Sequence, residues 1–262
     1  MKKILALVLA ALMLLSTLSA CKSVEAPSDT KPAETNEPPA APETTEPAEE
    51  ETKEPAEEEP TQEELDQQAA DEVAAMIDAI YVQTRTEETD AQCEAAKAAW
   101  DALTDAQKEL VEGEEASPDY FGLDTGDASL DDPRNQDDIG ENELLVVSFG
   151  TSFNASRVAD IKAIEDALQE ANPDWSVRRA FTAQIIINHI QARDGEKIDN
   201  MEQALERAVA NGVKNLVVQP THLMHGAEYD EMCEAIDNYR EHFESVSIAE
   251  PLLGEVGSDA TV

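Results

Sequence analysis

The chain is poor in cysteine, in aromatic residues and in basic side chains. Its 262 residues include three cysteines, 4% aromatic residues, and 18 Lys and Arg against 58 Asp and Glu. So few cysteines, spread over separate segments, do not make a disulfide framework. The formal net charge of −40 argues against binding to nucleic acid and against electrostatic adhesion to anionic lipid.

The longest apolar run opens the chain. Lys2 and Lys3 precede the run ILALVLAALMLL, which is too short to span a bilayer as a mature helix. The sequence LSAC follows and resembles the lipobox of bacterial lipoproteins, in which the cysteine is lipidated. We therefore expect residues 1–21 to be a lipoprotein signal peptide with lipidated Cys21, and the protein to be extracytoplasmic and anchored to the cell membrane. The alternative is an ordinary secretory signal that happens to contain a cysteine.

Two acidic segments show no periodicity. Residues 22–60 are rich in Pro, Glu and Thr and are predicted to form a disordered tether, because they have almost nothing to bury. Residues 114–142 are predicted to be an acidic linker. The spacing of Asp124 and Asp127 suggests calcium, but the full calcium-loop pattern is absent, which favours a plain connection.

Residues 61–113 between these segments have helical periodicity. Thr61 and Glu64 form a capping box, and apolar residues then recur at helical spacing as far as Ile80. A second helical stretch carries Trp100. We expect a small all-α module with Trp100 in its core and no catalytic group.

From residue 143 to residue 262, strand patterns alternate with helical ones. The strand runs are ELLVVSF (143–149), SVRRAFT (176–182), NLVVQPTHL (215–223) and SVSIAEPLL (245–253). This alternation predicts an α/β domain with a parallel sheet of four strands and helices on both faces. Ligands of such sheets bind beyond the carboxyl ends of the strands.

The motif SFGTS lies at one of these ends. It closes the first strand and opens a helix, and there free backbone N–H groups and the hydroxyls of Thr151 and Ser152 favour an anion. Ser148 and Gly150 complete the motif. It matches neither dinucleotide nor P-loop glycine patterns, so no nucleotide cofactor is expected. The alternative is a tight turn with a helix cap.

Three potential metal ligands follow the third strand. His222, His225 and Glu228 stand at three-residue intervals and suit a divalent first-row metal, and either histidine could also move a proton. The alternative is a histidine with a local hydrogen bond and a glutamate that stabilises a helix N-terminus. His189 and His242 lie in polar helical contexts and are expected to be solvated.

Several motifs together resemble a known family. The motifs ELLVVSFGTS, RRAFT, QARDGEKID, VVQPTHLMHGAEYDEM and AEPLL occur in the order and spacing of the anaerobic (class II) sirohydrochlorin cobaltochelatases, over roughly residues 143–254. These enzymes insert Co²⁺ into sirohydrochlorin on the anaerobic route of cobalamin biosynthesis. The resemblance implies two similar α/β domains facing across a cleft that holds the polycarboxylate tetrapyrrole.

The resemblance also assigns residues. It implies that the tetrapyrrole is faced by Ser148, Gly150, Thr151, Ser152, His222 and Glu228. In the family the catalytic histidine and the second metal-binding histidine come from the C-terminal domain, which we expect to be missing from this chain. This half would therefore have no catalytic residue of its own, with His222 and Glu228 in supporting roles. The metal set would be His222, His225 and Glu228, although His225 replaces a position that is often not histidine.

Two functions follow from this interpretation. The first is an extracytoplasmic sirohydrochlorin cobaltochelatase-like protein, with Co²⁺ as substrate metal and Fe²⁺ or Ni²⁺ also open. Its partners would be the tetrapyrrole, the divalent metal and, through the lipid anchor, the membrane. The alternative is a surface lipoprotein that binds tetrapyrrole or metal for uptake without catalysis.

Overall fold

The computed structural model describes residues 59–254. The signal peptide, the lipidation site at Cys21 and nearly all of the predicted tether lie outside the described residues, as do residues 255–262. Within the described part, no helix is long and apolar enough to cross a membrane. The helices are α2 (Gln62–Ile80), α3 (Thr89–Ala102), α4 (Asp105–Lys108), α5 (Asp119–Gly122), η1 (Ala128–Leu130), α6 (Asn154–Ser156), the π-helix η2 (Arg157–Lys162), α7 (Ala163–Ala171), α8 (Gln184–Asp194), α9 (Met201–Ala210), α10 (Ala227–Tyr239) and η3 (Arg240–His242). The strands are β1 (Asn142–Ser148), β2 (Ser176–Phe181), β3 (Asn215–Pro220) and β4 (Ser245–Ile248).

The four strands form one parallel sheet in the order β2-β1-β3-β4. This confirms the predicted α/β fold. The central strand β1 is buried from residue 143 to residue 148, since it pairs on both sides and is covered on both faces. The two-residue period of the strand then decides which side chains meet which helices.

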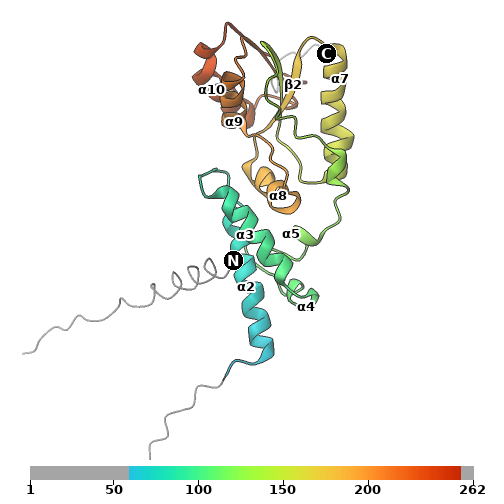
Figure 1. Ribbon diagram of the computed structural model, residues 1–262, viewed down its shortest axis with the longest axis vertical. Coiled ribbons are helices and arrows are strands. Elements are labelled where there is room, and N and C mark those ends of the chain that lie inside the picture. Colours follow the sequence, from blue (N-terminus) through green and yellow to red (C-terminus); the bar gives the residue numbers. More distant parts are fainter. Residues whose placement is uncertain (1–58, 255–262) are drawn as a thin grey trace, which may run out of the picture. The chain divides into compact units, whose positions relative to one another are not determined.

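The two faces of the sheet have separate apolar clusters. Leu145 and Val147 pack with residues of α9 and α10, among them Leu205 and Met232. Leu144 and Val146 point the other way and pack with Val177 and with Leu168 of α7. Figure 1 shows α7 and the pair α9 and α10 on either side of the strands. The helices thus cover both faces, as the alternating pattern requires.

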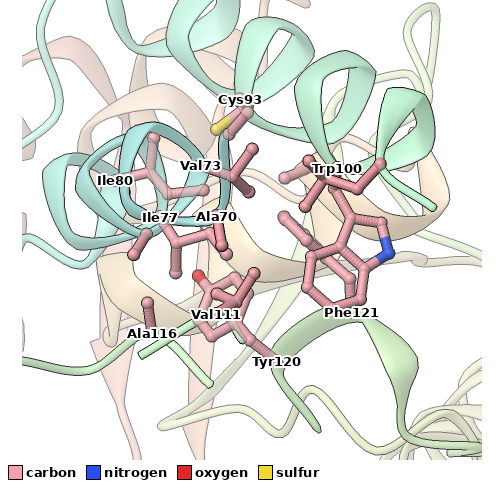
Figure 2. Packing of buried hydrophobic residues seen from close by; sticks show 14 residues of the cluster. Ala70, Val73, Ile77, Ile80, Cys93, Trp100, Val111, Ala116, Tyr120 and Phe121 are labelled. Atoms are coloured by element: carbon pink, nitrogen blue, oxygen red, sulfur yellow. The ribbon is translucent and has the colours of Figure 1, made fainter. Parts of the chain in front are cut away.

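Helices α2 and α3 share a core of their own (Figure 2). The capping box of Thr61 and Glu64 is present at the start of α2. Trp100 is buried, which confirms its predicted place in the core. The cluster also includes Ala192 of α8, and α3 packs along α8, so the helical segment and the α/β part meet at this helix.

The segment between the two parts contributes to this contact. Tyr120 and Phe121 of α5 are buried in the helical core (Figure 2), and the Tyr120 ring stacks on His189 of α8 with centroids 4.1 Å apart. The expectation that His189 is solvated was therefore wrong: burial lowers the pKa of His189 to about 4. His189 has the polar neighbours Asn188 and Gln191 in the sequence, but its ring is covered by the helical segment.

Strand β2 carries two adjacent arginines, and both are completely buried. Because neighbouring strand residues point to opposite faces, each needs its own carboxylates. Arg178 lies 3.0 Å from Glu143 and 3.0 Å from Asp199. Burial raises the pKa of Glu143 to about 7, and the attraction of Arg178 opposes that rise.

On the other face, Arg179 forms ion pairs of 2.7 Å with Glu165 and with Asp131. Asp131 also accepts a hydrogen bond of 2.6 Å from Arg157. Burial alone would raise the pKa of Asp131, but the hydrogen bonds from Arg179 and Arg157 hold it below its usual value. A residue of the connecting segment is thereby fixed inside the α/β part.

The outer edge of β2 is also occupied. The backbone N–H of Arg179 donates to the carbonyl of Arg134 over 3.1 Å, and that of Phe181 donates to the carbonyl of Asp199 over 3.0 Å. The Arg134 side chain donates to the carbonyl of Val177 over 3.4 Å. These two outward N–H groups and the Val177 carbonyl are therefore bonded within the described chain.

Candidate functional site

The ends of β1 and β3 are joined where the site begins. The hydroxyl of Thr221 donates to the hydroxyl oxygen of Ser148 over 2.9 Å. Two residues later Gly150 turns with φ +101°, and a Cβ there would lie 2.6 Å from Cδ2 of the buried Phe181 ring. Only glycine fits this turn without strain. The turn leaves Phe149 about half exposed at the sheet edge, with 45% of its surface accessible.

Thr151 and Ser152 lie in the same turn, but unlike the exposed Phe149 they form hydrogen bonds within the fold. The hydroxyl of Thr151 accepts a hydrogen bond from the backbone N–H of Phe153 over 3.2 Å. The carbonyl of Ser152 accepts one of 2.6 Å from Arg193 of α8. Neither residue lines the two cavities described below. Their role as tetrapyrrole or anion ligands stays a prediction.

A mainly apolar cavity of about 430 Å³ lies beyond the ends of β1 and β3. Its lining residues are Phe149, Thr221, His222, Leu223, Met224, Gly226, Ala227, Glu228 and Tyr229. The structure therefore brings two of the residues singled out in the sequence, His222 and Glu228, to the same cavity. It adds Phe149 from the other motif.

His222 is unusual among these residues. Both of its ring nitrogens are buried, and neither has a hydrogen-bond partner among residues 59–254. Buried polar atoms are nearly always paired, so unpaired ones in a cavity point to a ligand or to proton transfer. Burial lowers the pKa of His222, and the Glu228 carboxylate opposes that shift. His222 is therefore a neutral imidazole near pH 7 that can accept a proton.

His225 has other contacts. Its Nε2 lies 2.8 Å from an oxygen of Glu250, and its ring meets the Tyr229 ring edge-on at 4.6 Å. It does not line the cavity with His222 and Glu228. Nowhere in residues 59–254 do three or more His, Cys, Asp or Glu side chains form a group that could hold a metal ion. The metal set of His222, His225 and Glu228 stays a prediction.

A second cavity of about 230 Å³, lined mostly by polar and acidic residues, shares Glu228 with the first. Its lining residues are Gln83, Thr182, Gln184, Asn200, Met201, Glu202, Glu228, Glu231, Met232 and Ala235. The sequence analysis did not single out this group. Thr182 could have been singled out, because it follows the carboxyl end of β2, where ligands of such sheets bind. No pattern in the sequence connects Gln83, which follows α2, with this cavity.

Residues 142–262 match the family model described as cobalt chelatase (CbiK). This part of the chain belongs to the CbiK cobalt chelatase family. The sirohydrochlorin cobaltochelatase of Salmonella typhimurium is 37% identical over 110 residues, which cover 42% of this chain and 42% of that protein. The sirohydrochlorin cobaltochelatase CbiKC of Nitratidesulfovibrio vulgaris is 27% identical over 116 residues, 44% of this chain and 40% of that protein.

These matches confirm the family resemblance, but only for the residues that they cover. The CbiK-matched residues include β1 to β4 and both cavity motifs, but not α2, α3 or Gln83. The match covers 42% and 40% of the lengths of these two relatives. The helical segment therefore lies outside the part of the chain that matches the CbiK model.

Proposed function

We propose that this protein is a sirohydrochlorin cobaltochelatase-like protein whose CbiK part binds a sirohydrochlorin-type tetrapyrrole at the carboxyl edge of the sheet. Co²⁺ is the proposed substrate metal. The observation that carries the proposal is the pair of unpartnered, buried ring nitrogens of His222, next to Glu228 in a mainly apolar cavity. Membership of the CbiK family supports the choice of substrate.

The lining of the cavity suits a flat macrocycle. Phe149, Leu223 and Met224 are 45%, 56% and 42% exposed, and contact with the face of a ring would remove this apolar surface from water. Insertion of a divalent metal releases two pyrrole protons. A neutral His222 at the ring can accept one of them, and the other passes to solvent water; the Glu228 carboxylate stabilises the imidazolium that forms.

Binding is tested by titration of the 262-residue chain with sirohydrochlorin, followed by the change in its absorption spectrum. We expect saturable binding that His222→Ala and Phe149→Ala weaken. Glu228→Gln has a matched control in Glu234→Gln, an exposed position on the same helix α10 that lines neither cavity. Absence of saturable binding by the wild-type chain would refute the proposal.

Turnover separates insertion from binding without catalysis. The family resemblance assigns no catalytic histidine to residues 142–262, which favours a binding role for this part of the chain. We therefore expect that Co²⁺ added to the sirohydrochlorin complex is inserted little faster than in free solution. Rapid insertion that Glu228→Ala abolishes would show this expectation to be wrong and would support the enzymatic role.

The proposal includes a location. The basic start, the apolar run and the LSAC sequence support lipidation at Cys21, which would hold the protein at the outer face of the cell membrane. In a bacterial host that processes lipoproteins, the wild-type chain is expected in the membrane fraction and Cys21→Ser in the soluble or unprocessed form. An equal distribution of the two would exclude the anchor.

A further inference from the structure

Gln83 comes to the second cavity from outside the CbiK part. It lies in the connection between α2 and α3, yet it lines the same cavity as Glu228 and Asn200. Its side chain is exposed and takes part in none of the hydrogen bonds between residues 59 and 254. An amide at a cavity wall that is not used by the fold is available to a ligand.

A chain of amides fixes the first end of this connection. Asn188 of α8 donates to the carbonyl of Ile80 over 2.8 Å. Gln184 donates to the side-chain oxygen of Asn188, and Asn200 donates to that of Gln184, both over 2.8 Å. Asn188 and Gln184 are buried, and Gln184 and Asn200 line the cavity. The end of α2 is thus tied to the cavity wall by hydrogen bonds shielded from water.

The second end of the connection is held at Asp90 of α3. Its carboxylate accepts hydrogen bonds of 2.7 Å from Lys197 and 2.8 Å from Gln191, and it pairs with Arg85. The hydrogen bond from Lys197, with those from Gln191 and Arg85, holds the pKa of Asp90 far below its usual value. The connection between α2 and α3 is thus fixed at both ends to α8 and to the turn after it. The position of Gln83 is therefore set by the fold.

We propose that Gln83 is a specificity-determining residue whose amide donates a hydrogen bond to an acidic side arm of the bound tetrapyrrole. The inference rests on the proposed function and extends it, because it makes the helical segment a wall of the substrate site. Thr182 adds a buried hydroxyl that has no partner among the described residues. Glu202, Glu228 and Glu231 line the same cavity and disfavour a carboxylate there, so an acidic arm needs the unused hydrogen-bond donors of Gln83 and Thr182.

The test uses uroporphyrin, a porphyrin with eight carboxylates, as the probe. Its dissociation constant is measured by fluorescence at low ionic strength for Gln83→Ala, Gln83→Glu and Gln83→Lys. Gln92→Glu and Gln92→Lys carry the same charge changes at an exposed position of α3 that does not line the cavity. Thermal unfolding followed by circular dichroism checks that each variant keeps the wild-type fold.

A charge within contact distance of a carboxylate acts more strongly than one screened by solvent and salt. We expect binding about fivefold weaker for Gln83→Glu, about twofold weaker for Gln83→Ala and about fivefold tighter for Gln83→Lys. The Gln92 variants should stay within about twofold of wild type. If the Gln83 and Gln92 variants shift alike, or if the order at Gln83 is reversed, the inference is wrong and the proposed function stands. If the wild-type chain does not bind uroporphyrin, the inference is overturned, and the proposed function is overturned as well if sirohydrochlorin also fails to bind.

Discussion

Replacing Gly150 by alanine tests whether the turn after β1 is fixed by close packing. Gly150 has φ +101°, and its added Cβ would lie 2.6 Å from Cδ2 and 2.8 Å from Cγ of Phe181. The left-handed backbone costs an L-residue about 1–2 kcal/mol. Forcing a methyl group against a buried ring costs about a further 1–3 kcal/mol. We therefore expect Gly150→Ala to lower the free energy of unfolding by about 3–4 kcal/mol.

Gly140→Ala is the matched control for this substitution. Gly140 has φ +86°, but an added Cβ there would have no heavy atom within 4 Å, so only the backbone cost applies. Urea unfolding, followed by tryptophan fluorescence, should separate the two variants by about 2 kcal/mol. Gly150→Ala should also weaken tetrapyrrole binding, because it displaces the neighbouring Phe149. Equal losses of stability in the two variants would refute the packing argument.

Two further predictions concern buried charge. Since the pKa of His189 falls from the ordinary 6.5 to about 4 on folding, the unfolded chain takes up a proton between these pH values and the folded chain does not. The free energy of unfolding should therefore fall by on the order of 3 kcal/mol from pH 6.5 to 4. Urea titrations at both pH values should show this loss in the wild-type chain and not in His189→Phe. The same pH dependence in both proteins would contradict the burial of His189. Asp131→Asn leaves Arg179 and Arg157 without a full counter-charge and should cost about 3 kcal/mol or more, whereas Asp166→Asn at an exposed pair should cost under about 1 kcal/mol. Chemical denaturation measures both, and similar small losses would show that the buried network contributes little.

Local sequence patterns were sufficient to predict the strands and helices of the α/β part. The run from residue 143 to residue 149 predicted β1 because continuous apolar residues are typical of a strand covered on both faces. Helix α8 ends at Gly195, which has φ +73°, and a glycine directly after a helical run is the usual signal of such an end. His222 and Glu228 could be picked out because both follow the carboxyl end of β3, where ligands of such sheets bind.

Long-range partners could not be predicted in the same way. Asp131 and Asp132 are equivalent in any local pattern, and only the place where Arg179 enters the interior decides that Asp131 is the buried one. His189 lies next to Asn188 on a weakly amphipathic helix, and the local pattern does not show that α5 covers this side of the helix. Gln83 could not be predicted either, because it lies far from the CbiK motifs in the sequence and only the fold brings it to the cavity wall.

The occupied outer edge of β2 decides on which side of the sheet a further strand can pair. With the outward N–H groups of Arg179 and Phe181 already taken, an incoming strand finds no donors on that side. Any additional strand, from this polypeptide or from another molecule, would have to join beside β4. The sheet is thus extensible from one flank alone, and lengthening it there leaves both arginine ion pairs of β2 untouched.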